Sequence, residues 1–585
     1  MSHPPPLLEP RPAPASERVP PFVVAAATAT DRETIARLRH DVYARELRQH
    51  ATNDAERLRD ALDDWNVVLV AKTAGEIAGF ISITPPGRPA YSIDKYFRRV
   101  ELPFAVDDRL HEVRLLTVVK PHRGRDLAAL LMYAALRWVE AHAGTRIVAI
   151  GRREVAEMYE RVGLRRLGLS RQSGAVTYDL MLATVADIRA RAEAIAGLFE
   201  RLEERADWRL PFAFRRPAPC FHGGAFFGAI GEDFATLERR HAVINADVLD
   251  AWFPPAPGVL ATLTEHLPWL VRTSPPTGCD GLIDAVAAAR GVAREHLLVG
   301  GGSSDLIFRA LRHWLTPASH ALILDPTYGE YAHVLERVIG CSVDRLELAR
   351  ANAYALDLAC LQQALADRYD LIVLVNPNSP TGRHVPRAEL EPLLACVPET
   401  TRVWIDETYV EYAGAGESLE RFAARSENVI VCKSLSKVYA LSGARAAYLC
   451  AGPHHLESLR AITPPWVVSL PAQVAAVRAL ADPAYYAARY RETAEYRAEL
   501  AAGLRALGWD VLPGIANFLL CHLPPAGPDA ERVVQFARQR DVFVRNAAGM
   551  SQRLGDRCLR IAVKDRAANQ RVLDALRAAV SAEPA

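Results

Sequence analysis

The chain has 585 residues, of which 50% are hydrophobic and 24% charged, and its formal net charge is +1. A single hydrophobic core stops growing at about 250–300 residues, so this length predicts at least two domains. The balanced charge gives no field that would attract nucleic acid, and no apolar run reaches the ~20 residues needed to span a bilayer. We therefore expect neither nucleic acid nor membrane as a partner.

Cysteine usage and the N-terminal residues predict the compartment. Nine cysteines are scattered along the chain without a CxxC pair or a Cys/His spacing typical of zinc. Unpaired thiols are typical of the reducing cytosol, so we expect a cytoplasmic protein without a bound metal. Residues 1–21 lack the apolar core of a secretory signal, and their many prolines favour a disordered tail.

Residues 22–182 predict one α/β domain. The apolar runs VVLVAKT and IAGFISITP flank Ala74-Gly75-Glu76, a pattern typical of a β-hairpin. The run EVRLLTVV precedes a helix predicted from about Asp126 to Ala143, and the strand RIVAIG follows. Residues 183–219 predict a connecting helix, rich in i,i+4 charge pairs, and a proline-rich linker.

Residues 220–585 predict a second α/β domain. Apolar strands that alternate with helices indicate a mostly parallel sheet covered on both faces. The strand candidates are HLLVGGG, ALILDP, DLIVLVN, RVWIDE, NVIVCKS and AAYLCA.

Two glycine- or proline-rich segments of this domain follow predicted strands. Residues 300–305 (GGGSSD) open a helix, where free backbone N–H groups favour a phosphate, although Ser303 can equally serve as an N-cap. Residues 376–382 (NPNSPTG) predict a rigid loop after a buried strand. Either segment alone is also compatible with a purely structural role.

Two further segments supply an acid and an amine. Asp406 ends the apolar run of residues 404–409 (WIDETY), where the alternative is a helix cap or a turn. Lys437 lies in residues 433–445 (KSLSKVYALSGAR), between two serines and an apolar stretch. Such an enclosed setting favours the neutral amine that a Schiff base requires.

Taken together, the four segments resemble fold-type I pyridoxal-phosphate enzymes, and most closely the histidinol-phosphate aminotransferase branch of the class I/II aminotransferases. The resemblance covers about residues 240–580, with NPNSPTG, IDETY and SLSK followed by Arg445 in the family's order and spacing. It implies a mostly parallel seven-stranded large domain, a small C-terminal domain, pyridoxal 5′-phosphate as cofactor and a homodimer.

The resemblance also implies roles for individual residues. Lys437 would hold the cofactor as a Schiff base and move a proton at the substrate. Asp406 would face the pyridine nitrogen, and Tyr409 the ring hydroxyl. Tyr328 would stack on the ring, with Tyr331 as its rival. The cofactor phosphate would be held by Ser303, Ser304, Ser434, Ser436 and Arg445.

Substrate contacts are implied by the family pattern and by departures from it. Arg560 would bind the substrate α-carboxylate, and Asn245 marks the family's N-terminal substrate loop. Ser379 stands where the family usually has the Asn that bonds the ring hydroxyl, so either Ser379 or Asn378 would take that role. Residues 272–276 (RTSPP) replace the segment that lends a tyrosine to a substrate phosphate in the neighbouring subunit, which argues against histidinol phosphate as substrate.

In the first domain, residues 116–128 (LTVVKPHRGRDLA) resemble the pyrophosphate loop of GNAT-type acyltransferases. The resemblance implies that Val118, Arg123 and Gly124 bind coenzyme A at a helix N-terminus. Asp126 stands where the family has glycine, and its carboxylate would repel the pyrophosphate unless Arg123 and Arg125 offset it. The alternative is a helix cap in a domain that has lost coenzyme A.

Two more residues of this domain are candidates for acid–base chemistry. Residues 158–164 (MYERVGL) match the family's later segment, whose tyrosine, here Tyr159, protonates the departing thiolate. The helix RLRHDVYARELRQ is similar to that of acyl-homoserine-lactone and N-acyl-amino-acid synthases, a subgroup of this fold. Glu112 is a candidate general base for an incoming amine, and a solvated strand-edge carboxylate is the alternative.

We therefore predict a bifunctional biosynthetic enzyme. Its C-terminal domain would transfer an amino group between an amino acid and a 2-oxo acid, and its N-terminal domain would acylate an amine from an acyl-CoA. The alternative is a pyridoxal-phosphate decarboxylase, lyase or cyclase beside a non-catalytic binding or dimerisation domain.

Overall fold

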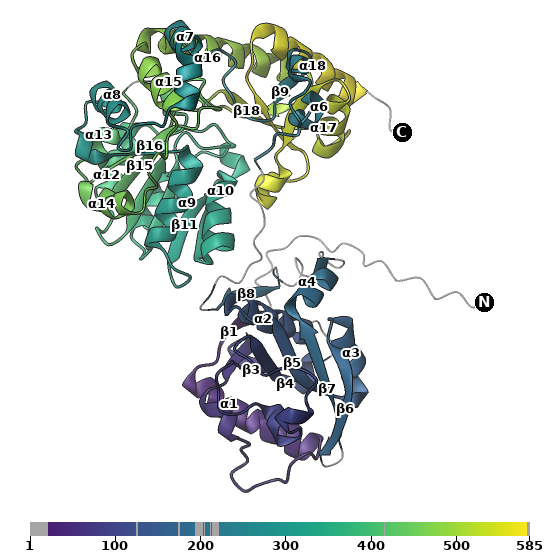
Figure 1. Ribbon diagram of the computed structural model, residues 1–585. Coiled ribbons are helices and arrows are strands. Elements are labelled where there is room, and N and C mark those ends of the chain that lie inside the picture. Colours follow the sequence, from purple (N-terminus) through teal and green to yellow (C-terminus); the bar gives the residue numbers. More distant parts are fainter. Residues whose placement is uncertain are drawn as a thin grey trace. The chain divides into compact units, whose positions relative to one another are not determined.

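The computed structural model describes residues 22–581 except 124–126, 174–175, 194–202, 204, 211, 213–221 and 415. The chain divides into two compact units, residues 1–216 and residues 217–585 (Figure 1). Among the described residues, no helix combines the length and the apolarity that a membrane span requires.

The N-terminal unit is built on a mixed sheet whose strand order is β6-β7-β5-β4-β3-β2-β1-β8, with β6 (Arg165–Ser173) at one edge. The predicted hairpin forms between β2 (Val67–Thr73) and β3 (Glu76–Thr84), which pair antiparallel. Ala74 and Gly75 in its turn have φ values of 49° and 83°, as a tight hairpin of this type requires. Helix α2 (Leu127–Ala141) packs its leucines against β3 and β4 (Leu110–Val118).

The segment predicted to be a linker contributes a strand to this sheet. Helix α4 (Val185–Glu193) follows β7 (Val176–Thr184), but β8 (Ala206–Arg209) then pairs in parallel with β1 (Phe22–Ala26). The prediction of only helix and linker over 183–219 is wrong at these residues. Four residues of moderate polarity (ADWR) carry no recognisable strand pattern, and β1 supplies the edge that orders them.

The C-terminal unit contains a large sheet of seven strands among its described residues, in the order β10-β16-β15-β14-β13-β11-β12. All six predicted strands are confirmed. They are β10 (Leu297–Gly300), β11 (His320–Asp325), β13 (Leu371–Val375), β14 (Arg402–Asp406), β15 (Val429–Ser434) and β16 (Ala447–Ala451).

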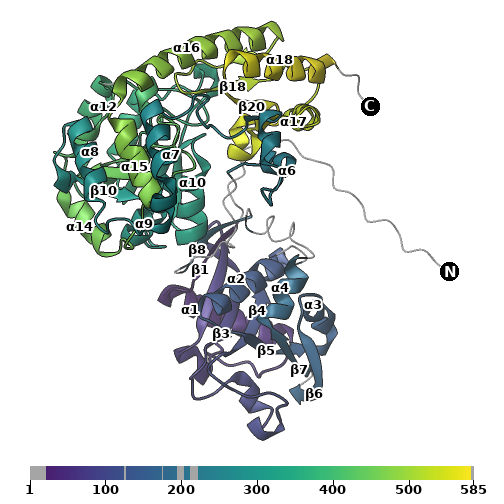
Figure 2. The same ribbon diagram turned by 45° about the horizontal axis from the view of Figure 1, so that its top comes forward.

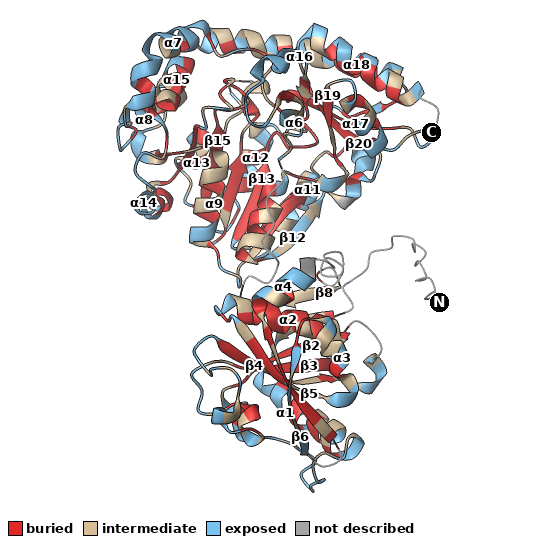
Figure 3. Cartoon of the chain, turned by 45° about the vertical axis from the view of Figure 1, so that its right-hand side comes forward, coloured by how far each residue is buried: buried red, intermediate tan, exposed pale blue. Residues whose placement is uncertain are grey.

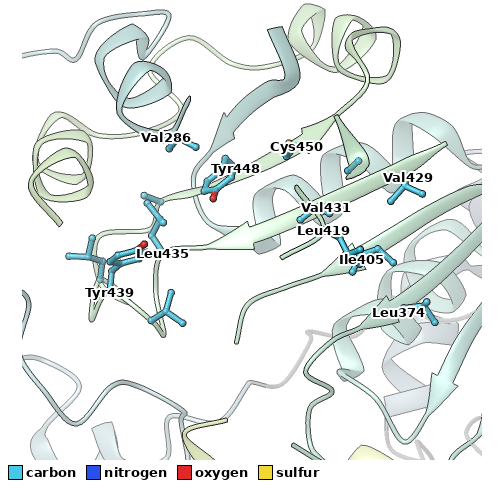
Figure 4. Packing of buried hydrophobic residues seen from close by; sticks show 14 of the residues in the cluster. Val286, Leu374, Ile405, Leu419, Val429, Val431, Leu435, Tyr439, Tyr448 and Cys450 are labelled. Atoms are coloured by element: carbon cyan, nitrogen blue, oxygen red, sulfur yellow. The ribbon is translucent and has the colours of Figure 1, made fainter. Parts of the chain in front are cut away.

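Pairing within this sheet is parallel except at β16, which runs antiparallel to β10 and β15. The central strands β13 and β15 are buried along their whole length (Figure 3). Leu374, Ile405, Val429 and Val431 belong to one packed core cluster (Figure 4). The edge strand β12 (Ser342–Glu347) alternates exposed and half-buried residues, and its apolar pattern was too weak to predict it.

A smaller sheet in the order β17-β18-β20-β19-β9, with β17 (Asp510–Val511) at one edge, completes the C-terminal unit. Its strands β18 (Phe518–His522), β19 (Val542–Asn546) and β20 (Cys558–Ala562) come from the end of the chain. Strand β9 (Ile244–Ala246) comes from the beginning of the unit and pairs in parallel with β19. Helix α18 (Arg566–Ser581) packs against α16 (Pro483–Ala506) and α17 (Ala530–Arg538) (Figure 2). The predicted mostly parallel seven-stranded domain with a small C-terminal domain is confirmed.

Candidate active sites

A cavity of about 340 Å³ lies at the carboxyl ends of the central strands of the large sheet. This is where ligands bind in open α/β sheets. It brings together every residue predicted for the cofactor and substrate of this unit except Asn245 and Asn378. Its lining residues are His222, Val248, Leu249, Asp250, Ser303, Ser304, Tyr328, Val375, Ser379, Asp406, Thr408, Tyr409, Ser434, Ser436, Lys437, Ser442, Arg445 and Arg560.

Asp406 ends β14 and is buried, with a fixed set of hydrogen bonds. Thr408 donates to Oδ1 from its backbone N at 3.0 Å and from its hydroxyl at 2.7 Å. The hydroxyl of Tyr331 donates to Oδ2 at 2.7 Å and itself accepts from Nε1 of Trp404. Burial raises the pKa of Asp406 above its ordinary value. Tyr331, the other candidate for ring stacking, thus orients the carboxylate of Asp406 and does not line the cavity. Tyr328 lines the cavity.

Lys437 lies in the loop after β15 and reaches the cavity. Its Nζ lies 2.9 Å from Oδ1 of Asp250 and 3.5 Å from Oγ of Ser442. The hydroxyl of Tyr412 donates to the Lys437 carbonyl at 3.1 Å and anchors the loop. Asp250 was not predicted, because it lies 187 residues earlier in the chain and no family motif marks it.

The phosphate end of the cavity gathers donors around the start of helix α9 (Ser303–Trp314). Gly302 has φ 101°, and a Cβ there would collide with the guanidinium of Arg445. The hydroxyl of Ser436 is buried without a hydrogen-bond partner among the described residues. A helix N-terminus, a guanidinium and an unpartnered hydroxyl suit an anion, so these residues fit the phosphate of the predicted cofactor.

Arg560, on β20, is 6% exposed and projects into the same cavity. Its Nη1 donates to the hydroxyl of Ser379 at 3.4 Å and its Nη2 to the carbonyl of Asp247 at 3.1 Å. No carboxylate of the described part of the chain forms a salt bridge with it, and its Nε has no partner there. Burial lowers its pKa to about 10, which still leaves it charged at neutral pH. A buried guanidinium without a counter-charge is a site for a ligand carboxylate.

Two predicted contacts are corrected by the geometry. The side chain of Asn378 is buried and bonds the carbonyl of Pro326 and the hydroxyls of Thr327 and Thr381, so it shapes the loop and does not face the cavity. Oδ1 of Asn245 accepts from the backbone N of Val248 at 3.0 Å, which makes it a turn residue. Both amides are engaged in local structure, and Ser379 lines the cavity instead.

The carboxylate of Glu330, beside Tyr328, was not predicted as part of the site. The buried carboxylate of Glu330 accepts from the hydroxyls of Tyr328 at 2.7 Å and Ser304 at 2.9 Å, and lies 3.0 Å from Nε2 of His222. Burial alone would raise the pKa of Glu330, but His222 and Tyr328 hold it below its ordinary value. Its place within PTYGEY was the available signal, since the segment joins a strand to a short helix.

The N-terminal unit has its own cavity, of about 120 Å³ and almost entirely apolar walls. Strands β4 and β5 (Arg146–Arg152) pair only at Leu110–Glu112, and the cavity lies beyond that point, where the two strands are no longer bonded. Tyr159 lines it, and burial raises the pKa of this phenol to about 12. The other lining residues include Val113, Leu115, Leu116, Met132, Ala149 and Ile150.

The predicted coenzyme A loop is described only in part. Val118 ends β4, and its carbonyl accepts from Nε of Arg123 at 3.0 Å. Arg123 also forms a bidentate ion pair with Glu46, so the guanidinium expected to face a pyrophosphate already has a counter-charge. Gly124 and Asp126, the other residues in question, lie outside the described residues.

Glu112 is fully buried in β4 and is not a solvated carboxylate. It accepts from the backbone N and the hydroxyl of Ser92 at 2.7 and 2.6 Å, from the N of Ile93 at 2.9 Å and from the hydroxyl of Thr84 at 3.1 Å. These four bonds fix the turn η3 (Ser92–Lys95) to the sheet. Four protein donors thus occupy both carboxylate oxygens, which favours a structural role for Glu112 over the predicted catalytic one.

Family comparisons cover both units. Residues 270–576 match the family model "Aminotransferase class I and II", and residues 34–186 match "N-acyl amino acid synthase FeeM". Histidinol-phosphate aminotransferase from Anaeromyxobacter sp. (strain Fw109-5) is 33% identical over 59% of this chain and 94% of its own. The same-named protein of Moorella thermoacetica (strain ATCC 39073 / JCM 9320) is 31% identical over 52% and 77%.

Solved structures show the same fold. Histidinol-phosphate aminotransferase from Sinorhizobium meliloti, in complex with pyridoxal-5′-phosphate, has a TM-score of 0.55 at 22% identity, over 62% of this chain and 95% of that one. L-threonine-O-3-phosphate decarboxylase from Porphyromonas gingivalis has a TM-score of 0.50 at 23% identity, over 57% and 98%. At these identities the likeness concerns the fold.

Proposed function

Because this chain belongs to the aminotransferase class I and II family and also carries an N-acyl amino acid synthase domain, we propose that its C-terminal cavity transfers an amino group between an amino acid and a 2-oxo acid. The observation that carries this proposal is the buried guanidinium of Arg560, without a counter-charge, in one cavity with Lys437 and Asp406. An amino acid held there by its α-carboxylate presents its α-carbon to the amine that must move the proton.

Pyridoxal 5′-phosphate, when bound, supplies an electron sink for the α-carbon of the substrate. Lys437 would hold it covalently, and Asp406 would keep its ring nitrogen protonated. The ring hydroxyl would be bonded by Tyr409 and Ser379, and Tyr328 would cover the ring face. The phosphate would be held by Ser303, Ser304, Ser434, Ser436 and Arg445.

The chain's own residues then carry out the proton transfers. Lys437, as a general base and acid, would take the proton from the substrate α-carbon and carry it until it is returned. Ser442, whose Oγ lies 3.5 Å from its Nζ, would keep the amine in reach. Arg560 would bind the α-carboxylate with two parallel N–H···O bonds, which fixes the orientation of the reacting C–H bond.

The decisive experiment supplies amino acids together with 2-oxoglutarate and measures glutamate. Formation of glutamate, together with the 2-oxo acid of the donor, is expected for amino transfer. Release of CO₂ or ammonia without glutamate would instead identify a decarboxylase or a lyase.

For the N-terminal unit, we propose transfer of an acyl group from acyl-CoA to an amine. The apolar cavity between β4 and β5 would receive the acyl chain, and Tyr159, which lines it, would protonate the departing thiolate. Thiol release from acyl-CoA in the presence of an amine, followed with a thiol reagent, tests this activity. Absence of both thiol release and calorimetric binding would leave a structural role for the unit.

We further propose that the enzyme is a cytoplasmic homodimer whose functional domains follow the two compact units, residues 1–216 and 217–585, because β8 completes the first sheet. Helix α7 (Pro257–Arg272) exposes Leu260, Leu267 and Val271 on one face, an apolar surface suited to a second copy. Light scattering after size exclusion measures the mass, and separate expression of the two residue ranges tests the boundaries.

A further inference from the structure

The charge of Asp250 is not explained by the proposed cofactor and carboxylate contacts. This residue lies in the loop between β9 and α7, lines the cavity, and places Oδ1 2.9 Å from Nζ of Lys437. Lys564 lies nearby, but its Nζ donates to the main-chain carbonyl of Asp250 at 3.1 Å. Among the described residues, Lys437 is the cation that forms a salt bridge with this carboxylate.

Asp250 is an anion at neutral pH. Burial alone would raise its pKa, but the ammonium of Lys437, the hydroxyl of Ser442 and the nearby Lys564 hold the pKa below its ordinary value. Ser442 and Lys564 keep this influence when Lys437 holds the cofactor. Its side chain is 36% exposed, so the carboxylate remains accessible from the cavity.

The other charges of the cavity each have a counterpart. Under the proposed function, Arg445 faces the cofactor phosphate, Asp406 the ring nitrogen and Arg560 the substrate α-carboxylate. The remaining charges pair within the protein, His222 with Glu330. Once the cofactor occupies the amine of Lys437, Asp250 has lost its salt-bridge partner, while the Nζ of Lys564 stays bonded to the main-chain carbonyl.

Resting on the proposed function, we infer that Asp250 recognises a positively charged side chain of the substrate, which places the amino donor among basic amino acids that carry an ammonium or a guanidinium group. A carboxylate in a partly buried wall attracts such a cation and repels a phosphate or a second carboxylate, so it selects by repulsion as well as by attraction. The loop supports this position, because the carbonyl of Asp247 bonds Arg560 and the carboxylate of Asp250 bonds Lys437. A substrate that spans Arg560 and Lys437 therefore lies along this loop.

The test compares donors of similar length and different charge on the holoenzyme. The cationic set is 2,4-diaminobutyrate, ornithine, lysine and arginine; the neutral set is norvaline, norleucine and citrulline; the anionic set is glutamate and phosphoserine. The rate of cofactor absorbance change gives kcat/KM for each donor. Calorimetry with 5-aminopentanoate, pentanoate and glutarate, which lack the α-amino group, measures binding without turnover.

We expect the wild-type enzyme to favour cationic over neutral donors by about tenfold in kcat/KM, and 5-aminopentanoate over pentanoate by a similar factor in affinity. Asp250→Asn, which keeps the shape and removes the charge, is expected to abolish both preferences. The exposed Asp556→Asn serves as the matched control and should keep both.

Equal use of neutral and cationic donors by the wild type would overturn the inference, as would a cation preference that survives in Asp250→Asn. If Asp250→Asn fails to bind the cofactor, Asp250→Ser is measured in its place. The donor series measured on the wild-type enzyme tests the inference whether or not either variant folds. If no donor of any charge converts the cofactor, amino transfer itself fails, while calorimetry still reports whether the cavity prefers a cation.

Discussion

The cavities of the two units differ in the polar and charged groups of their walls that have no partner in the protein. In the C-terminal cavity, the guanidinium of Arg560 and the hydroxyl of Ser436 have open bonding capacity among the described residues. In the N-terminal unit, two charged groups predicted for the site are already satisfied, Glu112 by four donors and Arg123 by Glu46. Arg114, which lines the cavity, pairs with Asp60 through Nη2, and its Nη1 has no partner among the described residues. Open polar capacity along much of a wall marks a site that binds a charged ligand, whereas a cavity with almost entirely apolar walls suits a chain held by hydrophobic contact.

The largest expected effect comes from Lys437→Ala. Removal of the amine eliminates both covalent attachment of the cofactor and the proton carrier, so amino transfer should fall by at least about a thousandfold. Acyl transfer by the same protein should be unchanged. The absorbance of the purified protein and glutamate formation measure the two losses; a variant that still showed the wild-type cofactor spectrum would move the attachment site elsewhere.

A smaller effect is expected for Arg560→Lys. A lysine keeps the charge but cannot form the two parallel bonds of a guanidinium, so KM for the amino donor should rise about 10- to 100-fold with less change in kcat. Steady-state kinetics at saturating 2-oxo acid measure the changes in KM and kcat separately. Arg577→Lys, on the exposed face of α18, is the control. An unchanged KM would show that the α-carboxylate binds at another residue.

On the side of the N-terminal cavity, Tyr159→Phe should slow acyl transfer by about 10- to 100-fold and leave amino transfer intact. Burial raises the pKa of Tyr159 to about 12, above its ordinary value, so the phenol keeps its proton as the pH rises. The acyl transfer rate of the wild type should therefore not fall between pH 7 and pH 10 through loss of this proton. Thiol release across that range is the measurement, and an unaffected Tyr159→Phe would exclude the tyrosine as proton donor.

The smallest effect on activity is expected for Glu112→Gln. An amide cannot accept from all four donors, so the turn at Ser92 should be destabilised by about 2–4 kcal/mol while acyl transfer per folded molecule persists. Hydrogen exchange of the peptide containing Ser92 and Ile93 should accelerate, and Glu76→Gln, at an exposed strand end, should not show this change. Complete loss of acyl transfer in a folded Glu112→Gln protein would restore a chemical role for the carboxylate.

Local sequence patterns predicted the elements whose structure depends on residues close together in the chain. Asp406 and Lys437 follow apolar strands within short motifs, and both lie in the cavity at the ends of β14 and β15. The short edge strands β8 and β12 escaped prediction, because their residues are ordered by a neighbouring strand more than by their own apolarity.

Contacts over long sequence distance could not be predicted. The pairing of Asp250 with Lys437 depends on how β9 joins the small sheet. Tyr328 and Tyr331 are three residues apart in one motif, and only the fold separates the one that lines the cavity from the one that bonds Asp406. The surroundings of Glu112 were not predicted, because the sequence at Ser92 gave no sign that this segment would fold back on the strand.

The pairing of β9 with β19 places the residues of the C-terminal cavity on two sheets. Arg560 and the loop that carries Asp250 adjoin the small sheet, whereas Asp406 and Lys437 adjoin the large one. A substitution that shifts β9 or β19 should therefore displace both substrate-binding groups together, relative to the groups that act on the α-carbon. Choice of donor and rate of turnover thus depend on how the two sheets pack, and Arg560 itself joins them through its bond to Ser379.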